Sequence, residues 1–75
     1  MVVVYRKARW SIAIYGREHG EPHFHITGPE FRCSVAINSL ELIIGTAPAP
    51  VLRDALAWAR LNRLALLQRW RELNG

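Results

Sequence analysis

The spacing of apolar residues changes once along this chain, near Pro50, and this change strongly constrains the fold. Up to about residue 45, apolar side chains recur at every second position, which is typical of β-strands with one covered face. Over residues 50–73 they recur with the helical period of about 3.6 residues. Since 75 residues suffice for one domain only, the pattern predicts a single α+β domain over residues 1–75. We expect an antiparallel four- or five-stranded β-meander within residues 1–45, packed on one face by one or two helices within residues 50–73.

Four runs show the alternation, with apolar positions at Trp10/Ile12/Ile14, Phe24/Ile26, Phe31/Cys33/Val35/Ile37 and Leu40/Leu42/Ile44. Residues 2–5, rich in β-branched side chains, are a candidate fifth strand. Turn-forming residues separate the runs at positions 16–22, 28–29 and 38–39. We expect residues 45–50 to form an extended bridge, because Pro48 and Pro50 disfavour helix in the residues before them.

The helical segment carries a stripe of apolar residues on one side: Leu52, Ala55, Leu56, Ala59, Leu66, Leu67, Trp70 and Leu73. A continuous helix would place Arg63 inside this stripe. We therefore expect a break near residues 60–62, with Asn62 capping a second helix. Trp58 and Trp70 are expected to be packing residues.

The chain is basic: ten Lys and Arg residues against six acidic ones give a net charge of +4, and nine of the ten are arginine. Arginine offers a planar fork of donors that matches phosphate and carboxylate groups. The charge therefore favours an anionic partner, either nucleic acid or an acidic protein.

Cys33 is the one cysteine, so an intrachain disulfide framework is excluded, and the alternation places its thiol in the core, where it is expected to be inert. No run approaches the roughly 20 apolar residues of a membrane-spanning helix, and residues 1–5 are too few for the apolar core of a signal peptide. We expect a soluble, cytoplasmic protein without membrane contact.

The three histidines of the chain, His19, His23 and His25, lie within seven residues of one another. On a strand, His23 and His25 emerge from the same face, about 6–7 Å apart. Because Phe24 and Ile26 then face the core, the two imidazoles are expected on the open face of the sheet.

A hairpin after His25 would bring further polar side chains to this face. If residues 27–30 form its loop, the register pairs Ile26 with Phe31, His25 with Arg32, and His23 with Ser34. The predicted polar cluster comprises His23, His25, Arg32, Ser34 and Tyr15, with Arg17 and His19 in a nearby loop.

One interpretation of the cluster is a metal site. The spacing of His23 and His25 suits chelation, and His19 or Glu21 would supply a third ligand. Neutral imidazoles bind zinc and would leave one coordination position open. Arg32 argues against this interpretation, because it would place a positive charge beside the cation.

A second interpretation is RNA binding or cleavage that needs no cofactor. Histidines titrate near neutral pH, so His23 and His25 would act as an acid/base pair, with Arg32 stabilising charge on the phosphate. The other candidate contacts to RNA or another anion are Arg17, Tyr15 and Ser34. In a third interpretation the histidines are not catalytic and belong to a solvated surface or a protein–protein contact.

Three stretches together resemble a known family: Ile12-Ala13-Ile14-Tyr15, then His19-Gly20-Glu21-Pro22-His23-Phe24-His25-Ile26, then a helical region with Pro50, Trp58 and Trp70. They are similar, over nearly the whole chain, to a small prokaryotic domain, domain of unknown function 4160. Its members typically have a Pro-Pro-His-Phe-His segment. Here Glu21 stands in place of the first proline, Asn62 in place of a helix histidine, and residues 1–7 differ from the usual proline-rich start.

The resemblance implies a gene context in which members are paired with another short protein, as in toxin–antitoxin modules. It also implies that His19, His23 and His25 are the motif positions. We therefore expect the small basic member of a bacterial two-protein module, directed at RNA, with a cognate small protein partner. Zinc binding through the three histidines and a non-catalytic interaction module are the alternatives, and the small core makes a homodimer conceivable.

Overall fold

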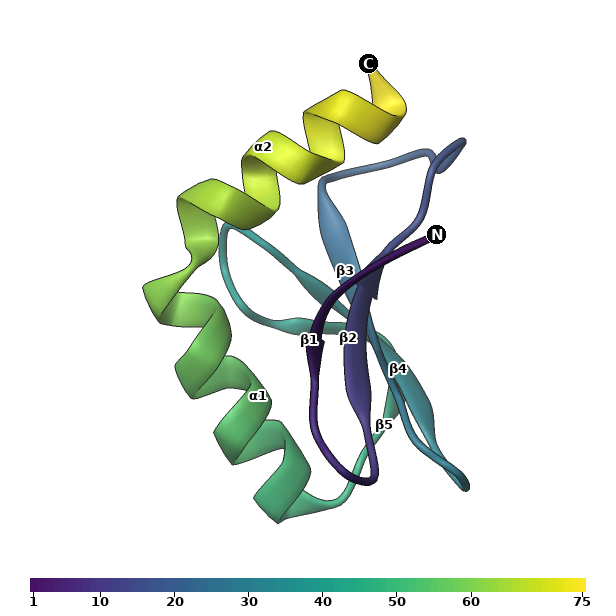
Figure 1. The fold of residues 1–75 in the computed structure, drawn as a ribbon, viewed down its shortest axis with the longest axis vertical. Coiled ribbons are helices and arrows are strands. Elements are labelled where there is room, and N and C mark those ends of the chain that lie inside the picture. The colour runs from purple at the N-terminus through teal and green to yellow at the C-terminus, as the bar shows by residue number, and fades with distance from the viewer.

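The computed structural model describes residues 1–75 and shows a five-stranded sheet followed by two helices (Figure 1). The strands are β1 (Val2–Arg6), β2 (Ser11–Ile14), β3 (His23–Thr27), β4 (Arg32–Ala36) and β5 (Leu42–Thr46), and the helices are α1 (Ala49–Leu61) and α2 (Arg63–Asn74). Neighbouring strands are antiparallel, and their order in the sheet is their order in the chain. The predicted α+β meander is therefore confirmed, with the fifth strand included.

The core lies between one face of the sheet and the two helices. The alternating positions of β2, β3 and β4 supply its fully buried side chains, among them Ile12, Phe24 and Val35. The predicted stripe packs against them: Ala55, Ala59, Leu66 and Trp70 are buried, and Leu52, Leu56, Leu67 and Leu73 are half-buried. Neither helix has the length and hydropathy that crossing a membrane would require.

Cys33 and Trp58 are both packing residues, as the sequence pattern predicts. Cys33 is buried, and desolvation raises the pKa of its thiol, which keeps it in the unreactive protonated form. Trp58, half-buried, stacks on Tyr5 of β1 with ring centroids 4.5 Å apart, so it packs the helix against the edge of the sheet.

The helical region is broken where the sequence predicts, since α1 ends at Leu61 and α2 begins at Arg63. The role expected for Asn62 is wrong: its side chain makes no capping bond to α2. Its Nδ2 instead donates to the carbonyl of Trp58 at 2.8 Å, at the end of α1. Arg63 donates from Nε to the carbonyl of Ile37 at 3.1 Å, which holds the bend against the chain that follows β4.

β5 departs from the expected alternation, because Leu42, Ile43 and Ile44 are all exposed. It is an edge strand, and the buried cluster between sheet and helices contains none of its residues. The bridge expected over residues 45–50 is also shorter, since β5 continues to Thr46 and α1 starts at Ala49. Within β5, only glycine fits easily at position 45. Its φ is +78°, and a Cβ there would lie 2.3 Å from the carbonyl oxygen of Arg32 on β4.

Candidate metal centre

Two histidines project from β3 on the side of the sheet away from the core. Because side chains alternate along the strand, Phe24 and Ile26 are fully buried while His23 and His25 share the other face. Their ring centroids lie 5.2 Å apart. The shared face is as predicted, but it is not open to solvent, since only 12% of the His23 side chain and 19% of the His25 side chain are exposed.

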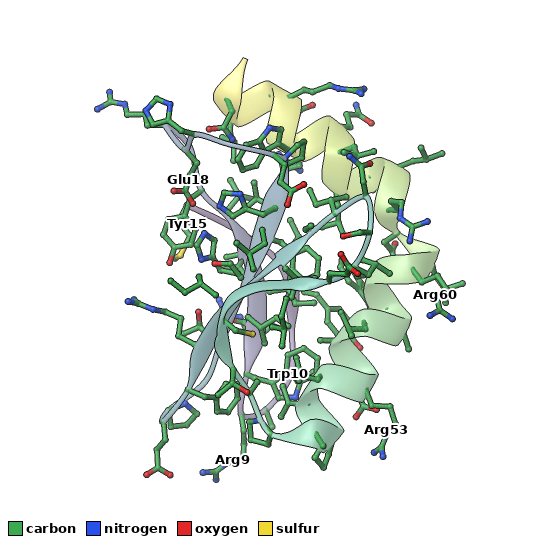
Figure 2. All side chains as sticks on the ribbon, turned by 180° about the vertical axis from the view of Figure 1, so that it is seen from behind. Arg9, Trp10, Tyr15, Glu18, Arg53 and Arg60 are labelled. Atoms are coloured by element: carbon green, nitrogen blue, oxygen red, sulfur yellow. The ribbon has the colours of Figure 1, made fainter.

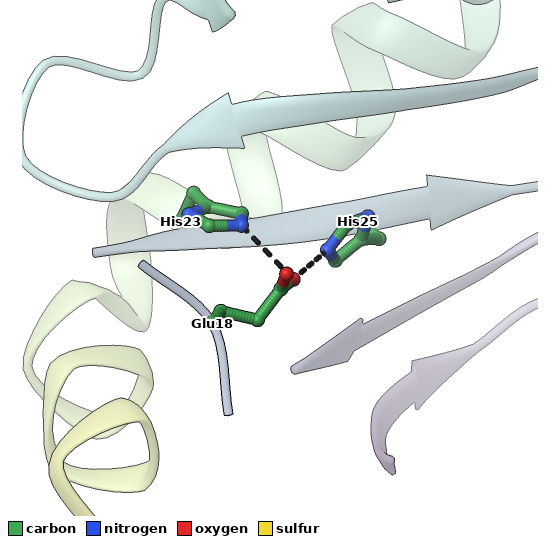
Figure 3. Close-up of side chains that lie close together, drawn as sticks. All are labelled: Glu18, His23 and His25. Carbon is green, nitrogen blue, oxygen red and sulfur yellow. Dashed lines mark hydrogen bonds and ion pairs between the residues drawn. The ribbon is translucent and has the colours of Figure 1, made fainter. Parts of the chain in front are cut away.

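The chain between β2 and β3 covers this face and brings Glu18 to the histidines (Figure 3). The carboxylate oxygen Oε1 of Glu18 lies 2.7 Å from Nε2 of His25 and 3.1 Å from Nε2 of His23. The loop turns toward the strand at Arg17, whose φ of +59° is uncommon for a side chain other than glycine. Three potential ligand atoms, all within 4.8 Å of one another, therefore converge from Glu18, His23 and His25.

Two aromatic rings border the cluster. The ring of Tyr15, at the end of β2, lies 4.4 Å from the ring of His25. Trp70 of α2 lies 4.8 Å from the ring of His23. These contacts contribute to the low exposure of the two imidazoles. The loop covers their face of the sheet, and α2 brings Trp70 to His23 at the end of the sheet.

The hydrogen bond at Nδ1 of His23 determines what its other ring nitrogen, Nε2, can do. Nδ1 lies 2.9 Å from the carbonyl oxygen of Glu21, which can only accept, so Nδ1 carries a hydrogen. In a neutral ring Nε2 is then a bare acceptor, and it faces the carboxylate of Glu18, which is also an acceptor. This approach is favourable only when a positive charge lies there, either a proton on Nε2 or a metal ion between the two atoms.

In His25, by contrast, both ring nitrogens have suitable hydrogen-bond partners even when the ring is neutral. Its Nδ1 lies 3.3 Å from the hydroxyl oxygen of Ser34, which is able to donate. A neutral His25 can therefore accept at Nδ1 and donate from Nε2 to Glu18. That hydrogen bond is the main cause that lowers the pKa of Glu18 below its ordinary value of 4.5; burial opposes the shift and His23 adds to it. Glu18 is therefore an anion at neutral pH.

Asn74, the last residue of α2, holds the loop that carries Glu18. Its Oδ1 accepts from the backbone N–H of Glu18 at 2.8 Å, and its Nδ2 donates to the carbonyl of Tyr15 at 3.0 Å. The loop also approaches α2 closely at Gly16, where a Cβ would lie 3.4 Å from the carbonyl oxygen of Leu73. Asn74 therefore positions Glu18 from the opposite end of the chain.

The position predicted for Arg32 is wrong. Arg32 pairs with Thr27, while His25 pairs with Ser34 and His23 with Ala36. The loop comprises residues 28–31 and is closed by the Gly28 N–H, which donates to the Phe31 carbonyl at 3.0 Å. The register is thus shifted by two residues, which keeps every side chain on its predicted face but moves the exposed Arg32 away from the position opposite His25.

The other predicted site residues divide into two groups. Tyr15 and Ser34 contact His25, so the structure brings them to the cluster. Arg17 and His19 are exposed loop residues, and His19 is not among the converging ligand atoms.

Glu18 and Asn74 are the residues that sequence reasoning missed. The third ligand was expected from His19 or Glu21, but Glu21 contributes its backbone carbonyl and not its carboxylate. Nothing in the spacing distinguishes Glu18 from Glu21, because the backbone turn at Arg17 and the anchor at Asn74 decide which carboxylate reaches the histidines.

Comparison with known proteins gives one assignment. A family model described as Domain of unknown function (DUF4160) matches residues 10–71, a range that includes β2 to β5, α1, most of α2 and all three residues of the cluster. No curated protein and no solved structure matches this chain. Since the matched range covers most of its 75 residues, the chain belongs to the family of the domain of unknown function 4160.

Proposed function

We propose that this domain binds one divalent metal ion of the zinc class through Glu18, His23 and His25. The observation that carries the proposal is the convergence of two imidazole Nε2 atoms and one carboxylate oxygen within 4.8 Å. Two histidines and one glutamate form a known ligand set of catalytic zinc sites, in which a fourth position takes water or substrate.

Two of the three distances between ligand atoms are close to those of this ligand set. Around a tetrahedral zinc ion, neighbouring N and O ligand atoms are about 3.3 Å apart, given metal–ligand bonds of about 2.0–2.1 Å. The contacts of 2.7 and 3.1 Å from Glu18 to the two rings need only small side-chain adjustments to reach that value. The ligand nitrogens of His23 and His25, which lie within 4.8 Å of each other, would have to come within the same distance. The half-buried carboxylate leaves one side of the cluster open to solvent.

The hydrogen bond that His23 makes with its other ring nitrogen also suits a metal site. Ligating histidines usually donate their other ring N–H to a carbonyl or a similar acceptor, which fixes the tautomer. His23 does this through the Glu21 carbonyl. A metal ion would satisfy the two acceptors, Nε2 of His23 and Oε1 of Glu18, that face each other at 3.1 Å.

The geometry supports a metal-independent acid/base pair less well. Three of the four ring nitrogens of His23 and His25 have hydrogen-bond partners when both rings are neutral, the fourth faces the Glu18 carboxylate, and both side chains are largely buried. Arg32, the expected phosphate anchor, lies opposite Thr27. A bound zinc ion would instead supply Lewis-acid chemistry or an activated water at the open position.

RNA remains the proposed target class, supported by the net charge of +4 and the preponderance of arginine. From the family resemblance we further propose that the protein acts in the bacterial cytoplasm as the basic member of a toxin–antitoxin-like pair. In that role the metal centre would make it a metal-dependent ribonuclease.

Zinc titration by calorimetry tests the metal site directly. Chelator-treated, untagged protein is expected to bind one zinc ion per chain. His25→Ala should lower the affinity by more than about 100-fold, because it removes a direct ligand, whereas changes in outer contacts cost 10–100-fold. His19→Ala is the matched control, since it removes an exposed histidine of the same segment and should leave the affinity unchanged. No uptake by the wild type, or equal losses in both variants, would disprove the site.

Replacing Asn74 by alanine is expected to weaken zinc binding by about 10–100-fold, although Asn74 is not a ligand. The substitution removes the hydrogen bonds that hold Glu18 and Tyr15 in place. Zinc calorimetry measures the loss, and Asn38→Ala, at an exposed asparagine in another turn, is the control. Wild-type affinity in Asn74→Ala would show that the loop is positioned without it.

A further inference from the structure

A second candidate site lies at the other end of the sheet from Glu18. A cavity of about 830 Å³ is formed there by the β1–β2 turn, the β3–β4 loop and the connection from β5 to α1. Figure 2 shows Arg9 and Trp10 toward this end, with Tyr15 and Glu18 toward the other. Its size is within the range of about 300–1,000 Å³ that is usual for small-molecule sites.

The walls of the cavity are aromatic and apolar. Trp10 and Phe31 line it from two different turns, and Ala47, Pro48 and Val51 line it from the β5–α1 side. Two cations, Lys7 and Arg9, and one anion, Glu30, stand among the lining residues. The site therefore combines flat apolar surfaces with a net positive rim.

Local contacts hold both aromatic walls. The Lys7 N–H donates to the Trp10 carbonyl at 2.8 Å, which closes the β1–β2 turn, and the Trp10 ring lies 5.9 Å from that of Tyr5. The loop of residues 28–31 is closed by its own backbone hydrogen bond. The Phe31 ring lies directly over Gly28, where an added Cβ would approach it to 2.2 Å. The cavity is thus preformed.

From these features, and resting on RNA as the proposed target class, we propose that the cavity binds a nucleotide of single-stranded RNA. The base would stack on Trp10 or Phe31, and Lys7 and Arg9 would contact the adjoining phosphates. Aromatic surfaces beside cations bind single strands with little sequence preference, because every base has a π-face. This site shares no residue with the metal centre, so the two proposals can fail separately.

Fluorescence anisotropy with a labelled ten-residue oligouridylate measures the binding. Arg9→Ala is expected to weaken it by about tenfold and to reduce the slope of log K against log salt by about 0.7, the value for one lost phosphate contact on a single strand. The matched control is Arg60→Ala, which removes the same charge from an exposed position on α1 (Figure 2). It should change neither the affinity nor the slope appreciably.

A second variant tests the aromatic wall without changing charge. Gly28→Ala forces the Phe31 ring to move, and we expect oligouridylate binding to weaken about fivefold or more. Circular dichroism before the titration confirms that the variant is folded. Asn38→Ala, at an exposed position outside both the cavity and the metal centre, should bind the RNA as the wild type does.

The proposal is overturned if Arg9→Ala and Arg60→Ala weaken binding equally, since that would indicate only general attraction between charges. It is also overturned if neither Arg9→Ala nor Gly28→Ala weakens binding. A further outcome against it is preference for a ten-residue acidic peptide with one phenylalanine over the oligouridylate, because the cavity would then be a protein-docking site.

Discussion

Saturating zinc is expected to raise the midpoint of thermal unfolding of the chelator-treated protein by about 15 °C or more. An ion that binds only the folded state stabilises it by about 4 kcal/mol when its concentration is a thousand times Kd. In a domain of this size each kcal/mol shifts the midpoint by about 4–8 °C. The effect should be large because the three ligands come from a loop and a strand that come together only on folding.

Glu18→Gln should abolish most of this shift, because it keeps the size of the side chain but removes the anionic ligand. Glu21→Gln is the matched control, since that carboxylate lies outside the cluster. Differential scanning fluorimetry with and without zinc gives the comparison. An undiminished shift in Glu18→Gln would mean that zinc binds elsewhere on the protein.

Both the zinc-induced shift of the unfolding midpoint and the stability of the metal-free protein are expected to fall at acidic pH. With zinc present, the shift should shrink as the pH falls from about 7 to about 5.5, because protons compete for the imidazole nitrogens. Without metal, the pKa of Glu18 is lower in the folded protein than its ordinary value of 4.5. Its contribution to stability is therefore present above pH 4.5 and is lost as the pH falls further through the folded-state pKa.

Phe24→Ala is expected to destabilise the fold by about 3–5 kcal/mol. Phe24 is fully buried between the sheet and the helices. A chain of 75 residues has a total stability of only about 4–11 kcal/mol, so a large fraction of the variant should be unfolded at 37 °C. Urea unfolding followed by circular dichroism measures the loss.

Ile44→Ala is the control for this prediction. It also shortens an apolar strand residue, but Ile44 is 70% exposed on the edge strand β5. The free energy of unfolding should fall by no more than about 0.5 kcal/mol, as for other surface substitutions. Similar losses in the two variants would show that burial against the helices is not what stabilises the sheet.

The candidate site was predictable in part. Alternation along residues 23–27 places His23 and His25 on one face and Phe24 in the core, and the structure agrees. The facing residue on β4 was not predictable from alternation, because a shift of two residues keeps the same faces. In the structure Phe31 lies in the loop, with its ring over Gly28, and Arg32 faces Thr27.

Local patterns in the amino-acid order were sufficient for the meander, the two helices, the break before Arg63 and the common face of the two histidines. All of these follow from period and turn chemistry, which act between residues close in the chain. Such patterns do not predict that Glu18 contacts the histidines or that Asn74 contacts Glu18. Glu18 and Asn74 are 56 positions apart. Their contact exists because α2 crosses the end of the sheet, and no short-range periodicity encodes that approach.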